Sequence, residues 1–65
     1  MKINVVIPNY NGSDLIAKNL PSVLDSVKKY PDSLIIIVDD GSDETDYRKL
    51  KDFVSSLKSD RIFVE

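Results

Sequence analysis

The stretch from Leu34 to Asp43, with the sequence LIIIVDDGSD, decides the fold. Its first five residues are all apolar and form the strongest strand signal in the chain. A continuous apolar run is typical of a strand that is buried on both faces of a parallel sheet. The acidic pair Asp39 and Asp40 and the turn residue Gly41 end this run, and a helical pattern follows. The stretch therefore predicts a strand that leads into a helix within an α/β fold.

Two further strands are predicted on either side of this one in the sequence. The β-branched run Ile3–Ile7 predicts a first strand, which Pro8 should stop because proline cannot donate a hydrogen bond to a sheet. The residues Ile62–Val64 predict a third strand.

Helical spacing of apolar residues separates the three predicted strands. The first helix is expected over 13–29, with Pro21 kinking it or splitting it into two. The apolar face of the second helix comprises Tyr47, Leu50, Phe53, Val54 and Leu57. The resulting order β-α-β-α-β predicts a parallel sheet with right-handed crossover connections.

Composition excludes several classes of protein. The 65 residues include no Cys and no His, which excludes a zinc finger, a thiol nucleophile, an imidazole base and a disulfide framework. The formal charge is −2, from 9 basic and 11 acidic residues, so no nucleic-acid partner is expected. No targeting signal is recognised at the N-terminus, and the longest apolar run is far shorter than the ~20 residues of a membrane span. We expect a cytoplasmic protein, with the cytoplasmic face of a membrane also open to the full protein.

The size of the chain bears on its domain organisation. A domain of this length buries only ~60% of the surface that its unfolded chain exposes. We therefore expect residues 1–65 to be the first part of a larger α/β domain. A complete three-stranded miniature is the alternative.

Polar residues gather where the first two predicted strands end. In an open α/β sheet, ligands bind beyond the carboxyl ends of the strands. The segments Pro8–Asn11 and Asp39–Ser42 should therefore share one rim. A carboxylate there could accept a hydrogen bond from a ribose hydroxyl or a base N–H, or could simply be solvated beside a helix cap. Tyr10 could stack on a base or pack against the first helix.

Two phosphate-binding signatures are absent from the sequence. Gly12 and Gly41 are the only glycines, so neither a G-x-G-x-x-G dinucleotide fingerprint nor a G-x-x-x-x-G-K-[ST] phosphate loop is present.

The segments Val5–Gly12 (VVIPNYNG) and Ile36–Asp43 (IIVDDGSD), in this order and at this distance, resemble the start of a family 2 glycosyltransferase. The resemblance implies the Rossmann-like GT-A fold, with residues 1–65 as the N-terminal nucleotide-binding portion of an incomplete glycosyltransferase-like domain. It also implies transfer of a sugar, with inversion, from a nucleotide-sugar donor that is UDP- or dTDP-linked. The acceptor would be a saccharide, a lipid-linked or another hydroxyl compound.

The resemblance also implies roles for individual residues. Pro8 and Tyr10 would border or stack on the base, and Asp40 would bind the base edge, with Asp39 as the neighbouring candidate. In the family, a D-x-D element that holds Mg²⁺ or Mn²⁺ and a carboxylate general base lie further downstream. Neither occurs in these residues, so we expect no catalytic and no metal-binding residue here, and no turnover by residues 1–65 alone.

Two other classes of function stay open at the level of sequence. One is a receiver-like signalling domain, in which Asp39 and Asp40 would form an acidic Mg²⁺ site and residues 1–33 would be an unrelated segment. The other is a non-catalytic interaction module. An unpaired edge at Ile62–Val64 could dock on a partner or drive self-association.

Overall fold

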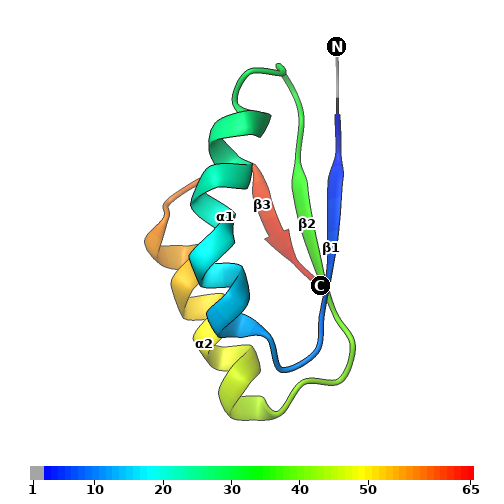
Figure 1. Ribbon diagram of the computed structural model, residues 1–65, viewed down its shortest axis with the longest axis vertical. Coiled ribbons are helices and arrows are strands. Elements are labelled where there is room, and N and C mark those ends of the chain that lie inside the picture. Colours follow the sequence, from blue (N-terminus) through cyan, green and yellow to red (C-terminus); the bar gives the residue numbers. More distant parts are fainter. Residues whose placement is uncertain (1–2) are drawn as a thin grey trace.

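The computed structural model describes residues 3–65 and has the predicted order of elements. Strand β1 (Val5–Asn9) leads into helix α1 (Ser13–Val27), and strand β2 (Ile35–Asp39) follows. Helix α2 (Glu44–Ser56) then leads into the short strand β3 (Ile62–Val64). Figure 1 shows the two helices side by side along the three strands. The predicted α/β class and the β-α-β-α-β order are therefore confirmed.

The three strands are parallel and lie in the order β1-β2-β3. Asn9, the last residue of β1, is paired with Asp39, the last residue of β2. Each crossover moves one strand further in the same direction, and a right-handed crossover then places both helices on the same face of the sheet.

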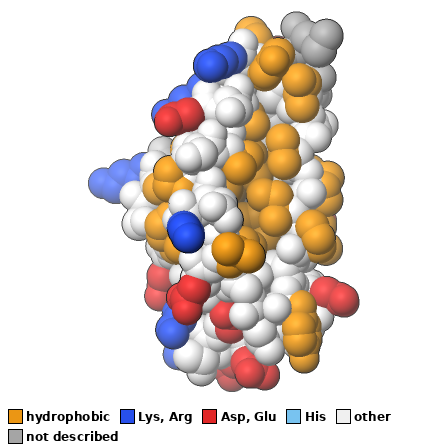
Figure 2. All heavy atoms as spheres, in the orientation of Figure 1, with side chains coloured by type: hydrophobic (Ala, Val, Ile, Leu, Met, Phe, Trp, Pro, Cys, Tyr) orange, Lys and Arg blue, Asp and Glu red, His pale blue; other side chains and the backbone are white. Residues whose placement is uncertain are grey.

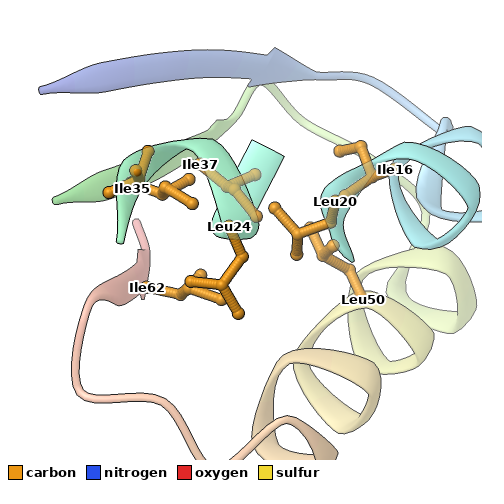
Figure 3. Packing of buried hydrophobic residues seen from close by; sticks show 8 residues of the cluster. Ile16, Leu20, Leu24, Ile35, Ile37, Leu50 and Ile62 are labelled. Carbon is orange, nitrogen blue, oxygen red and sulfur yellow. The ribbon is translucent and has the colours of Figure 1, made fainter. Parts of the chain in front are cut away.

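The hydrophobic core lies between this face of the sheet and the two helices. Leu20, Ile35, Ile37 and Leu50 are almost completely buried and come from three different elements. Figure 3 shows their side chains converging with those of neighbouring core residues between the sheet and the helices. Each such side chain contributes about 1.5–3 kcal/mol through its removal from water. The remaining core residues are Ile16, Leu24, Val27 and Ile62.

The opposite face of the sheet is not covered by residues 3–65. Val6 is 61% exposed and Phe63 is 48% exposed, although both lie in strands. The prediction that the strands are buried on both faces is therefore wrong for the described part of the chain. The continuous apolar runs do form strands, but both crossover helices pack on one face of the sheet and leave the other face open.

Two predicted boundaries also differ from the structure. Pro8 lies inside β1, opposite Val38. The hydrogen bonds from Val5 N to Leu34 O and from Asp40 N to Asn9 O involve odd-numbered residues of β1, so the backbone of Pro8 faces the free edge, where it needs no donor. Helix α1 continues through Pro21 as one helix, so the predicted split is wrong.

Neither helix in the described range 3–65 combines the length and the apolar character that crossing a membrane requires.

Candidate functional site

The ends of β1 and β2 are joined by a backbone hydrogen bond. The N–H of Asp40 donates to the carbonyl oxygen of Asn9 at 2.8 Å, one step beyond the paired residues Asn9 and Asp39. Tyr10 and Asp40 each follow a member of this pair, so the structure brings them to the same rim of the sheet. The two loops that the sequence places at one rim are thus neighbours in space.

The side chain of Asn9 forms a buried link between the two loops. Asn9 is 3% exposed, and its Nδ2 donates to Oδ2 of Asp39 at 3.0 Å and to Oγ of Ser42 at 3.2 Å. Its Oδ1 accepts a hydrogen bond from the N–H of Gly12 at 3.0 Å. From sequence, Asn9 could be interpreted only as a turn residue. Its partners in the second loop lie 30 and 33 residues away, and no local pattern indicates them.

Asn11 adds a second connection between the loops. Its N–H donates to Oγ of Ser42 at 2.8 Å, and its Oδ1 accepts from the N–H of Asp43 at 2.8 Å. Asn11 has a φ of 52°, a left-handed conformation that asparagine tolerates better than most residues. We call the four residues Asn9, Asn11, Asp39 and Ser42 the rim clamp.

Both carboxylate oxygens of Asp39 are used within the rim clamp. Oδ2 accepts from Asn9, and Oδ1 accepts from the N–H of Ser42 at 2.9 Å. Partial burial acts to raise the pKa of Asp39, but hydrogen bonds from Ser42, Asn9 and the Gly41 backbone outweigh it and hold the pKa below the ordinary value of 3.8. Asp39 is therefore ionised at neutral pH and occupied by protein donors.

Asp40 and Tyr10 differ from Asp39 because they face solvent. Asp40 is exposed, and its carboxylate makes no hydrogen bond with residues 3–65. Tyr10 is 67% exposed, so its ring is not packed into the core beside α1. The structure therefore leaves one carboxylate and one aromatic ring free at the rim.

A groove of about 310 Å³ lies between β1 and α1 beside the first loop. Its lining includes Pro8 and Tyr10, and also Leu15, Asn19 and Val23 of α1. Neither Asp39 nor Asp40 lines the groove. The groove therefore meets only the first of the two loops, and the candidate site is better defined by the joined strand ends.

The rim is acidic. Figure 2 shows acidic side chains at the lower end of the molecule, where the strands end and the helices begin. The acidic residues at this end of the molecule include Asp39, Asp40, Asp43, Glu44 and Asp46. An acidic rim suits an N–H donor on a ligand but repels a diphosphate, which needs a cation or basic side chains beside it.

The described residues do not form a site for a divalent metal. Among residues 3–65, no group of three or more His, Cys, Asp or Glu side chains is arranged to hold a metal ion. The two oxygens of Asp39 are already hydrogen-bonded to Asn9 and Ser42. The metal that the resemblance implies therefore does not fit the acids of this rim.

A family model described as glycosyl transferase family 2 matches residues 4–65. The chain belongs to glycosyl transferase family 2. The resemblance noted from the two strand ends is therefore confirmed, and the three parallel strands are consistent with the Rossmann-like start of a GT-A domain. Searches among curated proteins and among solved structures gave no significant match. Family membership supports glycosyltransferase activity but does not specify the donor, the acceptor or the stereochemical course.

The receiver-like alternative does not fit this glycosyl transferase family 2 chain. It requires residues 1–33 to be an unrelated segment, whereas β1 pairs with β2 along its whole length and α1 supplies half of the core residues. The first strand and helix belong to the same folded unit as the acidic pair.

Proposed function

We propose that this glycosyl transferase family 2 chain supplies part of the nucleoside pocket of a sugar-transferring enzyme. The donor is a UDP- or dTDP-linked sugar, and the acceptor is a saccharide, lipid-linked or other hydroxyl compound. The observation that carries this proposal is the hydrogen bond from Asp40 N to Asn9 O, because it holds Tyr10 and Asp40 at one rim. We further propose that residues 1–65 are the nucleotide-binding portion of a larger domain, which the open apolar face of the sheet supports.

The roles of the rim residues follow from the chemistry of the base. Uracil and thymine carry one imide N–H between two carbonyl groups, and the free carboxylate of Asp40 can accept a hydrogen bond from it. The exposed ring of Tyr10 offers a flat face for stacking, and Pro8 borders the same loop. Cytosine presents an unprotonated nitrogen at the equivalent position, so a carboxylate there would disfavour it.

The transfer step requires groups other than these. In an inverting transfer, the acceptor oxygen bonds to the anomeric carbon as the bond to the nucleoside diphosphate breaks. A base must take the acceptor proton, and a cation such as Mg²⁺ or Mn²⁺ must offset the charge of the leaving diphosphate. We propose that no residue of this chain performs either task and that its contribution is to binding.

Nuclear magnetic resonance titration of the chain with uridine tests the proposal without requiring a metal. We expect Asp40→Asn to weaken uridine binding about tenfold, since a charged hydrogen-bond acceptor is lost. Asp60→Asn is the matched control because it removes the same charge from the exposed turn before β3. Unchanged affinity in Asp40→Asn, or an equal loss in Asp60→Asn, would contradict the proposal.

A further inference from the structure

Asn9 has no unused hydrogen-bonding group in its side chain. Its two Nδ2 hydrogens serve Asp39 and Ser42, and its Oδ1 accepts from Gly12. A Cβ atom at Gly12 would lie 3.1 Å from Oδ1 of Asn9, so a larger residue at this position would crowd the amide. The side chain is therefore held in one orientation from both loops.

Asp39 is the charged partner of this amide, and each of its two carboxylate oxygens already accepts a hydrogen bond from the protein. One oxygen accepts from the side chain of Asn9, and the other accepts from the backbone of Ser42. The adjacent acid, Asp40, is exposed and unoccupied by the described residues. The two acids of the pair thus stand in different chemical environments.

The main chain of Asn9 connects the rim clamp to the candidate ligand contacts. Its carbonyl oxygen accepts the N–H of Asp40, and Tyr10 is the next residue along the chain. A change in the Asn9–Asp39 pair would therefore displace both loops at the point where the free carboxylate and the free ring are attached.

We propose that Asn9 and Asp39 are positioning residues of the nucleoside site, and that Asp39 is not a ligand contact. This inference rests on the proposed function and deepens it, because it divides the acidic pair into one acid that holds the rim and one that meets the base. What matters at positions 9 and 39 is one amide facing one carboxylate, in either order.

Exchange of the two side chains tests this directly. In Asn9→Asp, two carboxylates face each other, and in Asp39→Asn, two amides do, so each single variant loses a bond. In the double variant Asn9→Asp/Asp39→Asn, the amide at 39 donates to the carboxylate at 9, while the backbone N–H groups of Gly12 and Ser42 still meet oxygen acceptors. The hydroxyl of Ser42 can rotate to donate to the carboxylate at 9 and still accept from Asn11.

The readouts are uridine affinity and hydrogen exchange of the Asp40 amide, measured on folded samples checked by circular dichroism. We expect each single variant to bind uridine about tenfold more weakly and to exchange the Asp40 amide faster. The double variant should recover uridine affinity to within about threefold of the original chain and slow the exchange again. If the pair served stability alone, the single variants would exchange the Asp40 amide faster and the double variant would restore slow exchange, but uridine affinity would be the same in all of them.

Three results would overturn the inference. A double variant that folds and protects the Asp40 amide but does not bind uridine would show that the carboxylate at position 39 itself contacts the ligand. A double variant that fails to fold would show that the two side chains are not interchangeable. Single variants that bind uridine as well as the original chain would show that the pair does not position the site. Failure of the proposed function is distinct, because the unsubstituted chain would then not bind uridine at all.

Discussion

The carboxylate of Asp46 in the first turn of α2 accepts two hydrogen bonds from Ser13, the first residue of α1. Oδ1 of Asp46 lies 2.6 Å from Oγ of Ser13 and 3.3 Å from its backbone nitrogen. The two residues are 33 positions apart, and Ser13 is buried. Asp46 thus places a negative charge at the N-terminus of a helix to which it does not belong, where the helix dipole favours it. Asp46 lies in the first turn of α2, and its carboxylate thereby connects the two helices.

Loss of this contact should destabilise the fold. We expect Ser13→Ala to lower the melting temperature by roughly 5 °C, because a buried hydroxyl donor to a carboxylate is removed. Asp46→Asn should also lower it. Thermal unfolding followed by circular dichroism provides the measurement, with Ser22→Ala on the exposed side of α1 as a control. A melting temperature of Ser13→Ala equal to that of the control would contradict this interpretation of the contact.

Acid should destabilise the chain through the same carboxylates. The hydrogen bond from the Ser13 hydroxyl is the largest cause of the lowered pKa of Asp46, and the pKa of Asp39 is also below 3.8. The unfolded chain therefore takes up protons first as the pH falls. The stabilisation from these groups is complete above about pH 5 and is lost as the pH falls through their lowered pKa values. Melting temperatures measured from about pH 7 to about pH 2.5 should fall below about pH 4, and less steeply in Asp46→Asn.

Stacking by Tyr10 can be separated from folding because the ring is exposed. We expect Tyr10→Ala to weaken uridine binding about tenfold and Tyr10→Phe to leave it within about twofold, since phenylalanine keeps the flat face. Neither variant should change the melting temperature. The same titration with cytidine and guanosine tests the base: tighter binding of either than of uridine would show that the imide contact with Asp40 is wrongly assigned.

Self-association through the free edge of β3 is a further expectation. Ile35 N donates to Arg61 O and Glu65 N donates to Ile37 O, so odd-numbered residues of β3 face β2 and the backbone of Val64 faces the free edge. The corresponding edge of β1 carries Pro8, which hinders pairing, whereas β3 has no proline. If the chain self-associates, its apparent molecular mass by light scattering should rise with protein concentration. Val64→Pro should reduce this rise, and Val64→Ala should leave it unchanged. A clean monomer at high concentration in the original chain would exclude association through this edge.

Turnover by residues 1–65 alone is not expected. With UDP- or dTDP-linked sugars, Mg²⁺ or Mn²⁺ and a hydroxyl acceptor, the release of nucleoside diphosphate should stay at background, because we expect the metal ligands and the general base to be other residues than these. Release above background by the purified chain would show that catalytic groups are present here.

Much of the fold could be predicted from local patterns, and the misses have physical causes. The β-branched runs and the helical spacing predict all five elements in their observed order. Pro8 was expected to stop the first strand, but an edge position removes the penalty for its missing N–H. Pro21 was expected to kink or split the first helix, and the split is wrong because one helix runs through this residue. Burial on both faces was expected from apolar runs, which cannot indicate on which face the crossover helices pack.

The candidate site, like the fold, could be predicted from the sequence only in part. The sequence by itself determined that polar residues follow the first two strands, because strand-ending and turn-forming preferences are properties of adjacent residues. The resemblance favoured Asp40 for the base contact but kept Asp39 as the neighbouring candidate. Only the tertiary structure separated them, since the donors that occupy Asp39 come in part from Asn9, 30 residues away, and a contact of that range exists only once the two parallel strands have paired.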